Sequence, residues 1–191
     1  MLLPQLRFLL AALKNPREVS TIFQTMPWLR DHMMDSIDFS KIERLVELGA
    51  GAGAITAGIA DRLQKPEQYL GIELDHDLIE VLRERFPQLK FAEASAENVH
   101  DLTQASGPVD VIVSSLPWTL FPPEMRDHTM KNIADSLKPG GMFMTYMVVN
   151  AIFYPSAQDV IRQMKINFSR VEQSKLFWKN FPPAFVFTAY K

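Results

Sequence analysis

Three glycines follow an apolar segment in "VELGAGAG", residues 46–53, and an acidic residue stands a fixed distance downstream. Glycines at such a turn allow positive backbone angles and let the backbone approach a ligand closely. Glu73 lies 20 residues after Gly53, the spacing at which an acid accepts hydrogen bonds from ribose hydroxyls. Loop and acid together predict a nucleoside site at Gly49, Ala50, Gly51, Gly53, Glu73 and Leu74.

Glu47 narrows the choice of nucleoside. Dinucleotide enzymes share the glycine loop and the distal acid. A carboxylate two residues before the first glycine, however, would repel a pyrophosphate and suits a cation. S-adenosyl-L-methionine carries a positive sulfonium and an amino acid in place of phosphates. The residues therefore favour S-adenosylmethionine as the cofactor; the alternative for Glu47 and Glu73 is that both are ordinary solvated acids.

The surrounding elements have the order that such a site requires. Short apolar runs alternate with amphipathic stretches of helical length, which is typical of a parallel sheet with crossover helices. We expect helices near 53–64, 76–86, 123–137 and 156–167, the third ended by the glycines of "KPGG" at 138–141, and strands near 42–48, 69–73, 89–92, 109–114 and 141–149. Towards the C-terminus, "FSRVEQSKLFWKN" and "AFVFTAY" alternate apolar and polar residues, which predicts an antiparallel pair.

"VELGAGAG" resembles the first motif of the class I S-adenosylmethionine-dependent methyltransferases. The resemblance implies an α/β, Rossmann-like sandwich with a mostly parallel seven-stranded sheet and an antiparallel C-terminal strand pair. It also places Ser95, Ala96 and Glu97 of "FAEASAENV" at the adenine, and Ser114 beside the donor methyl. Many relatives have aspartate where Ser95 stands, so backbone amides would serve at that position.

Composition limits the remaining possibilities. A chain of 191 residues with 47% apolar and 22% charged residues predicts one globular domain, which we divide into an N-terminal helical segment, 1–35, and a methyltransferase domain, 36–191. The chain contains no cysteine, which excludes disulfides, thiol nucleophiles and cysteine-bound zinc. The four histidines lack the spacing of a metal site, so we expect no metal and assign no catalytic side chain.

The stretch "SSLPWTLFPP", residues 114–123, follows the fourth strand and should face the methyl acceptor, because ligands bind beyond the carboxyl ends of parallel strands. Ribosomal RNA adenine dimethyltransferases have a similar Asn-Leu-Pro-Tyr pattern here. This chain keeps Leu116, Pro117 and an aromatic residue, Trp118, but Ser115 replaces the amide that grips a base amine. A nucleic-acid substrate is therefore disfavoured.

A second family resembles the chain over essentially its full length. "SSLPW", "LKPGG", "FWKNFPPAFVF" at 177–187 and "FLLAALKNPREVSTIFQTM" at 8–26 are similar to segments of the bacterial phospholipid N-methyltransferases. The resemblance implies methyl transfer to the amine of a phospholipid headgroup, typically phosphatidylethanolamine. An alkyl amine is itself the nucleophile, so the protein must mainly position it, desolvate it and take it deprotonated.

Aromatic rings attract methylated ammonium groups through cation–π contact. Trp118, Tyr146 and Trp178 are the candidates for such contacts, with core packing as the alternative for each. We place Asn180 and Phe181 of the C-terminal motif in the same substrate site, Phe181 as a hydrophobic wall.

The first residues suggest a membrane contact. On a helical wheel Leu6, Leu9, Leu10 and Leu13 share one face, bordered by Arg7 and Lys14, an arrangement that lets leucines enter the acyl boundary of a bilayer. Residues 1–30 and 162–191 are both basic, which suits an anionic surface, although ordinary solvated charge is the alternative. We expect a cytoplasmic monomer, peripheral on the inner membrane face; a helix that only covers the cofactor is the other interpretation of this segment.

Three functional alternatives stay open. An RNA adenine methyltransferase shares the fold but needs a basic groove. A small-molecule methyltransferase has no need of the leucine-rich start. A relative that binds cofactor or lipid without turnover is the non-enzymatic alternative, against which the glycine loop and Glu73 both argue.

Overall fold

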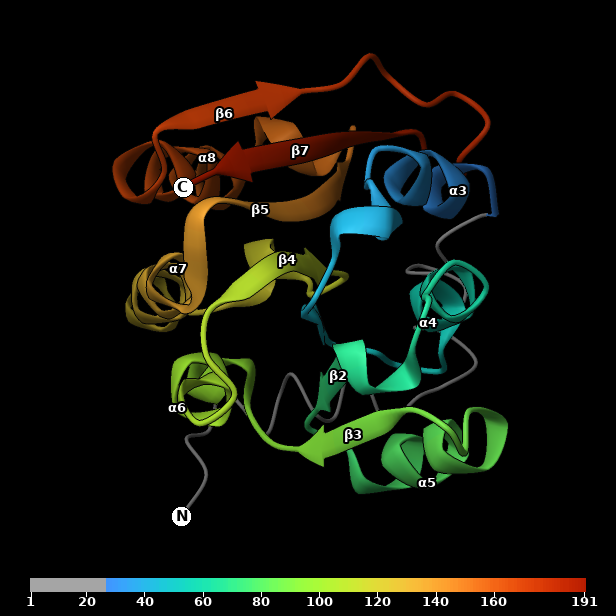
Figure 1. Cartoon of the computed structure of the whole chain (residues 1–191). Coiled ribbons are helices and arrows are strands. Elements are labelled where there is room, and N and C mark those ends of the chain that lie inside the picture. The colour runs from blue at the N-terminus through green and yellow to red at the C-terminus, as the bar shows by residue number, and fades with distance from the viewer. Residues whose placement is uncertain (1–26) are drawn as a thin grey trace.

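The computed structural model describes residues 27–191, which form one seven-stranded sheet between two layers of helices (Figure 1). The strand order is β3-β2-β1-β4-β5-β7-β6. The strands are β1 (Leu45–Leu48), β2 (Tyr69–Glu73), β3 (Lys90–Glu93), β4 (Val109–Ser114), β5 (Leu137–Val148), β6 (Arg170–Gln173) and β7 (Ala184–Tyr190). The helices are α3 (Pro27–Asp35), α4 (Ala54–Ala60), α5 (His76–Arg85), α6 (Val99–Gln104), α7 (Pro123–Ser136) and α8 (Pro155–Asn167).

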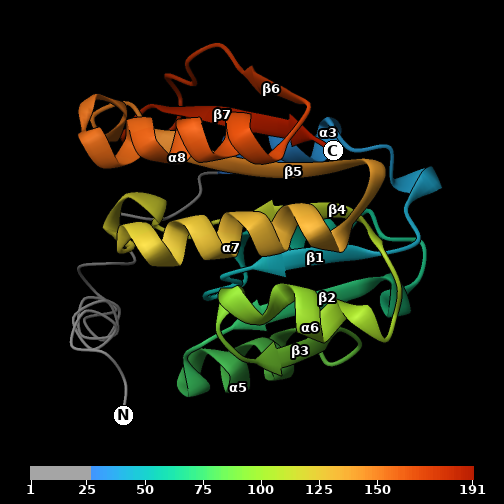
Figure 2. The same ribbon diagram turned by 90° about the vertical axis from the view of Figure 1, so that its left-hand side faces the viewer.

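Each face of the sheet has its own layer. Helices α3, α4 and α5 cover one face, and α6, α7 and α8 lie side by side across the other (Figures 1 and 2). Every residue of β1 and β4 is buried, as expected for central parallel strands covered on both sides. Two hydrophobic clusters result, one containing Trp118 and Phe143 and the other containing Leu29 and Tyr69.

The strand order creates the position at which a ligand binds. From β1 the chain moves outward through β2 to β3, and then returns to the other side of β1 to form β4. The loops that follow β1 and β4 therefore diverge to opposite faces of the sheet and leave a crevice beyond the carboxyl ends of the strands. The fold predicted from the sequence is confirmed, including the antiparallel C-terminal pair, β6 with β7. Strand β7 also pairs antiparallel with β5.

The interpretation of "KPGG" as a helix end was wrong. Helix α7 ends at Ser136, and Lys138, Pro139, Gly140 and Gly141 lie inside β5. Gly140 has φ +77° at an irregularity where the register with β4 shifts between Val109 and Val111. A positive φ serves a strand bulge as well as a helix cap, so the glycines mark a break in regular structure without showing its kind.

The C-terminal strand pair is shorter than predicted. Strand β6 ends at Gln173, and residues 174–183 form a long connection to β7, joined to it by an isolated bridge between Phe177 and Ala184. Trp178, Asn180 and Phe181 consequently lie in a loop and not in a strand. Helix α6 was also missed, because six residues are too few to show a helical period.

Helix α3 belongs to the core of the domain. Leu29, Met33 and Met34 are completely buried, and a Cβ atom at Gly58 of α4 would lie 2.7 Å from the Arg30 side chain. Residues 27–35 are thus packed into the described domain, and the division of the chain at residue 35 stays a prediction. The predicted leucine-rich membrane contact falls within residues 1–26, outside the described residues.

Candidate functional site

The glycine loop leaves the end of β1 in a conformation that only glycine adopts easily. Gly49, Gly51 and Gly53 have φ values of +72°, +56° and +87°. The Gly49 N–H donates a hydrogen bond of 2.8 Å to the carbonyl of Ile72, which ties the loop to β2. Gly53 is the N-cap of α4. Because L-residues are strained at such angles, the three glycines are required by the turn itself.

Glu73 holds the same loop by a hydrogen bond to its backbone. Its Oε2 accepts a 2.8 Å hydrogen bond from the Gly51 N–H, and its Oε1 accepts from the N–H groups of Leu74 and Asp75 at 2.7 and 3.0 Å. The residue is 7% exposed. A carboxylate has about four acceptor positions, so Oε2 retains one for a ligand hydroxyl. Glu73 therefore positions the loop and keeps the capacity to bind ribose that the sequence predicts.

Glu47 is completely buried in β1, two residues before Gly49. Its Oε2 accepts hydrogen bonds from the Tyr69 hydroxyl at 2.6 Å and the Thr56 hydroxyl at 2.8 Å, while Oε1 has no partner among the described residues. Burial raises the pKa of the Glu47 carboxyl to about 7, because an ionised group is poorly solvated there.

Gly71 makes the Tyr69 contact possible. It lies opposite Glu47 in the register between β1 and β2, and a Cβ atom at this position would come within 2.6 Å of the Tyr69 hydroxyl oxygen. The missing side chain leaves the space through which the Tyr69 hydroxyl reaches Glu47. Tyr69, Thr56 and Gly71 carried no recognisable signal in the sequence, since their meeting depends on strand register.

These features fit the predicted cofactor. Oε1 of Glu47, which has no hydrogen-bond partner within residues 27–191, is a buried acceptor in need of a donor or a cation. Among residues 27–191, no atom lies nearer than the Gly49 carbonyl, at 3.9 Å, to the position that a Cβ atom at Gly51 would take. Glu73 offers a carboxylate at the end of β2. Together they provide a cradle for a nucleoside with a cationic end; Leu74 and Ala50 border it in sequence, one half-buried and one buried.

The residues predicted at the adenine lie directly after β3. Ser95 is the N-cap of a short 3-10 turn, Ala96–Asn98, and accepts a hydrogen bond of 3.3 Å from the Glu97 N–H. Ala96 is buried, and Asn132 of α7 donates to the Glu97 carbonyl at 2.7 Å. These contacts fix the backbone of the turn, whereas adenine contact itself stays a prediction.

The bend after β4 reaches back to the glycine loop. The Ser115 hydroxyl donates a hydrogen bond of 2.5 Å to the Gly49 carbonyl, and a Cβ atom at Gly49 would lie 2.6 Å from Leu116 Cδ2. The buried Ser114 hydroxyl accepts from the Leu116 N–H and from Trp118 Nε1, both at 3.2 Å. The predicted acceptor stretch and the predicted cofactor loop are therefore in direct contact.

Trp118 has a packing role in this structure. It is 1% exposed, and its ring lies 5.6 Å from Phe121 and 6.0 Å from Phe143, edge to face with the latter. Core packing, the alternative interpretation of Trp118, describes this position. It therefore anchors the bend, and it also contributes to the lining of the pocket beside the bend.

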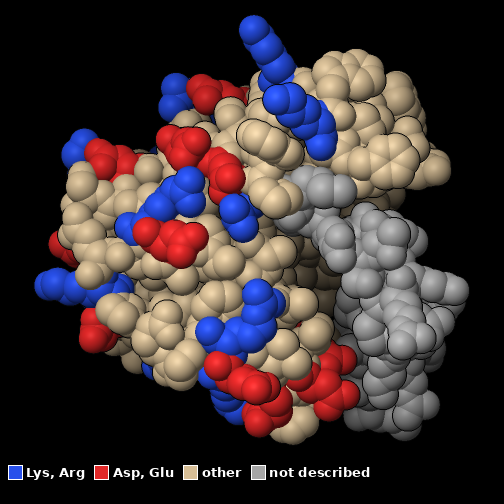
Figure 3. All heavy atoms as spheres, turned by 90° about the vertical axis from the view of Figure 1, so that its right-hand side faces the viewer, with Lys and Arg blue, Asp and Glu red and all other residues tan. Residues whose placement is uncertain are grey.

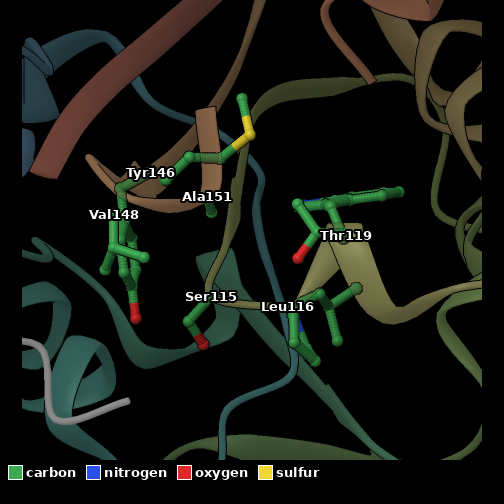
Figure 4. Close-up of a pocket in the computed structure, with 9 residues that line it drawn as sticks. Ser115, Leu116, Thr119, Tyr146, Val148 and Ala151 are labelled. Atoms are coloured by element: carbon green, nitrogen blue, oxygen red, sulfur yellow. The ribbon is translucent and has the colours of Figure 1, made fainter. Parts of the chain in front are cut away.

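A pocket opens beside the bend (Figure 4). Leu116 and Thr119 lie on one side of it, and Tyr146 and Val148 of β5 lie on the other. Among residues 27–191 the lining contains no charged side chain; its members there are Ser115, Leu116, Pro117, Trp118, Thr119, Tyr146, Met147, Val148 and Ala151. The sequence predicted Ser115 to Trp118 and Tyr146, while Val148 and Ala151 could have been found by the rule that ligands bind beyond strand ends.

Trp178, Asn180 and Phe181 lie in the connection that precedes β7. Trp178 and Phe181 are 76% and 79% exposed, and neither lines the pocket. Asn180 is buried and donates a hydrogen bond of 2.6 Å to the Pro182 carbonyl, which folds the loop on itself. The loop starts β7 at Ala184, opposite Val148, so it stands at the same edge of the sheet as the pocket.

We expect Gly49→Ala to lower the free energy of unfolding by about 2 to 4 kcal/mol. The left-handed φ costs about 1 to 2 kcal/mol, and displacing Leu116 adds about 1 kcal/mol or more. Gly140→Ala is the matched control, because it has φ +77° but nothing within 4 Å. Urea unfolding should show a smaller loss for Gly140→Ala and a partial recovery in Gly49→Ala/Leu116→Ala. Equal losses for the two glycines would contradict the proposed contact.

Within residues 27–191, no group of three or more His, Cys, Asp or Glu side chains is placed to hold a metal ion.

Comparison with known proteins agrees with this geometry. Residues 45–141 match the model of a family described as a methyltransferase domain. The chain is 32% identical over 135 residues to an ornithine lipid N-methyltransferase from Singulisphaera acidiphila, with 68% of this chain and 70% of that protein covered. It is 35% identical over 98 residues to a ribosomal RNA small subunit methyltransferase A from Burkholderia lata, covering 49% of this chain but only 36% of the relative.

Solved structures share the fold at low sequence identity. An O-methyltransferase from Bacillus cereus, solved in complex with SAH, has a TM-score of 0.69 and 14% identity, with 95% of this chain and 91% of the other covered. A TehB-like SAM-dependent methyltransferase from Corynebacterium glutamicum has a TM-score of 0.66 and 16% identity, with 95% and 97% covered.

Proposed function

This chain belongs to the class I methyltransferases, enzymes that use S-adenosylmethionine, and from that premise we propose that it methylates the amine of a membrane-lipid headgroup. The observation that carries the proposal is the similarity to an ornithine lipid N-methyltransferase, which extends over 68% of this chain. Phosphatidylethanolamine, its partly methylated forms and amino-acid lipids all present an amine of the required kind.

The uncharged pocket supports an alkyl amine as the acceptor. A headgroup ammonium that enters a lining of Leu116, Pro117 and Val148 loses water, and desolvation lowers the pKa of an ammonium. The neutral amine then has the lone pair that attacks a methyl carbon. Such a reaction requires positioning and exclusion of water more than acid–base side chains.

The contacts between bend and glycine loop supply the positioning. When bound, S-adenosylmethionine supplies an activated methyl group. Ser115 and Leu116 touch the glycine loop through Gly49 and also line the pocket, so the same residues border both ligands. Trp118, held by Phe121 and Phe143, fixes the direction of this bend.

The similarity to a ribosomal RNA methyltransferase favours RNA as the second candidate substrate. Against it, the Ser115 hydroxyl donates to the Gly49 carbonyl, and a serine offers no carboxamide with which to hold a base amine. The decisive experiment incubates the full chain with methyl-labelled S-adenosylmethionine, mixed lipid vesicles and total RNA, and then separates the products. We expect label in an aminolipid; label in RNA or in a soluble amine would refute the proposal.

The proposed place of action is the cytoplasmic face of the inner membrane, with peripheral attachment. Within residues 27–191, every helix is too short or too polar to cross a bilayer.

Replacement of Tyr146 should change the methylation pattern. It lines the pocket from β5, on the side opposite Leu116 and Thr119 (Figure 4), and is our candidate for the aromatic contact with a methylated ammonium. Cation–π attraction to a methylated ammonium contributes about 0.5 to 2 kcal/mol, equivalent to about 2- to 30-fold in binding. We expect Tyr146→Leu to bind mono- and dimethylated lipid more weakly by that factor.

Tyr146→Phe is the matched control, because it keeps the ring and removes only the hydroxyl. Chromatography of the labelled lipids should show intermediates accumulating with Tyr146→Leu but not with Tyr146→Phe. The same product pattern in all three proteins would contradict a role for the ring.

A further inference from the structure

Three segments project from the edge of the sheet that carries the pocket. Residues 115–123 follow β4, residues 149–158 follow β5, and residues 174–183 precede β7. Strands β4 and β5 are parallel, and β7 begins at Ala184 opposite Val148, the last residue of β5. The three segments therefore lie at the same end of the sheet as the pocket, and the first two contribute residues to its lining.

Large apolar side chains are exposed on these segments. The described residues contain eight exposed large hydrophobic side chains, and five of them lie here. They are Leu120 (56% exposed), Phe153 (81%), Tyr154 (59%), Trp178 (76%) and Phe181 (79%), which we call the aromatic rim. Apolar side chains gathered around one opening mark a contact surface, whereas single exposed ones need no explanation.

The charged side chains of the same segments are all basic. The chain has 22 acidic residues, yet none falls in 115–123, 149–158 or 174–183. The two charged residues in these segments are Lys175 and Lys179, and Lys179 Nζ lies 4.8 Å from the centre of the Trp28 ring at the start of α3. Figure 3 shows charged side chains over much of the α3, α4 and α5 face, while a lobe at its upper right shows none and has basic side chains beside it.

We propose that the aromatic rim, with Lys175 and Lys179, is the surface by which the folded domain docks on an anionic lipid bilayer. Tryptophan and tyrosine favour the membrane interface, and each lysine near an anionic surface contributes attraction that salt weakens. The purpose of docking rests on the proposed function, since a headgroup amine enters the pocket only when the pocket mouth faces the bilayer. This surface lies in residues 115–183 and is distinct from the leucine-rich stretch before residue 14.

Composition favours lipid over the other partners. Two lysines provide little neutralisation for a nucleic acid, whose binding grows with the number of phosphates contacted. A second copy of the chain would bring the same positive charge against itself. An anionic bilayer meets both the apolar rings and the lysines.

The test is sedimentation of the full chain with vesicles of phosphatidylcholine and phosphatidylglycerol in equal parts. We expect Trp178→Ala/Phe181→Ala to weaken binding about tenfold or more, since two large apolar side chains no longer enter the interface. Lys175→Gln/Lys179→Gln should weaken it about fivefold per lysine at low salt and much less at high salt.

Matched controls lie at the opposite end of α8. Ile166 is 63% exposed and Lys165 is also exposed, so Ile166→Ala and Lys165→Gln remove comparable groups away from the rim. Both should bind vesicles like the unaltered protein. Calorimetric binding of S-adenosylmethionine by each variant verifies that the site is folded.

The experiment distinguishes a failure of the docking proposal from a failure of the proposed function. The Lys175→Gln/Lys179→Gln variant should still methylate a short-chain aminolipid dispersed in detergent, because neither lysine lines the pocket. Vesicle binding that the rim substitutions leave intact would overturn the docking surface even if detergent-dispersed lipid is methylated. Rim-dependent binding of RNA, or rim-dependent dimers in sedimentation equilibrium, would overturn it as well, by assigning the surface to another partner. Docking without methylation of any lipid would reject the proposed function alone.

Discussion

Replacing Glu73 with glutamine will weaken binding of S-adenosylmethionine about 100-fold or more. The carboxylate accepts three backbone N–H groups, and one of them belongs to Gly51 at the centre of the glycine loop. Hydrogen bonds to a charged group contribute about 1.5 to 3 kcal/mol each. Glutamine offers one acceptor oxygen, and its amide N–H₂ would oppose one of these donors. The loss of about 3 kcal/mol corresponds to the expected factor in affinity.

Glu93→Gln is the matched control for this substitution. Glu93 lies beside Glu73 in the register between β2 and β3, but its side chain is exposed and contacts His76. Isothermal titration calorimetry should show near-normal affinity for Glu93→Gln, and circular dichroism should show that both variants are folded. Normal affinity in a folded Glu73→Gln protein would remove Glu73 from the cofactor site.

The parts of the fold that could be predicted are those whose signals are local. Strands 69–73 and 109–114 were predicted to the residue, because apolar runs there end at polar or turn residues. The glycine loop was recognisable because a turn that needs positive φ is visible as glycine in the sequence. Glu73 was recognisable by its spacing of 20 residues from Gly53.

The parts that could not be predicted depend on tertiary contacts. "KPGG" could end a helix or interrupt a strand, and the pairing of β5 with β4 decided between them. Trp118 lies in the predicted bend, yet its ring packs against Phe143 of β5 as well as against Phe121 of the same bend, and the contact with β5 is not visible in the sequence. The contact of Tyr69 with Glu47 depends on Gly71, which lies opposite Glu47 where β1 pairs with β2. The linear sequence does not show this pairing.

Glu47 should make the stability of the protein depend on pH below and around neutrality. Its pKa is about 7 in the folded protein against 4.5 for an ordinary glutamate, because burial disfavours the ionised form. The stabilising contribution of the protonated group is fully present below about pH 4.5 and is lost as pH rises through about 7, where the folded protein must keep an ionised carboxylate buried. The total loss over this interval is about 3 kcal/mol.

Glu47→Gln isolates this contribution, because its amide does not titrate and its carbonyl oxygen can accept from Tyr69 and Thr56. We expect urea unfolding to show the free energy of unfolding of the unaltered protein falling relative to the variant by about 3 kcal/mol between pH 4.5 and 7.5. Glu67→Gln, an exposed acid near the start of β2, should show no such difference. A constant difference between the two proteins across this range would mean that Glu47 is already ionised.

Cofactor binding provides a second measurement on the same group. Oε1 of Glu47 is buried and has no partner in the part of the chain that the structure describes, and a cation placed beside it would favour the ionised carboxylate. Binding of S-adenosylmethionine should therefore release a proton near pH 6.5, so that its affinity rises with pH, and Glu47→Gln should abolish this dependence. Calorimetry in buffers of different ionisation enthalpy measures the released proton directly. If the unaltered protein releases no proton, Glu47 does not interact with the positive charge of the cofactor.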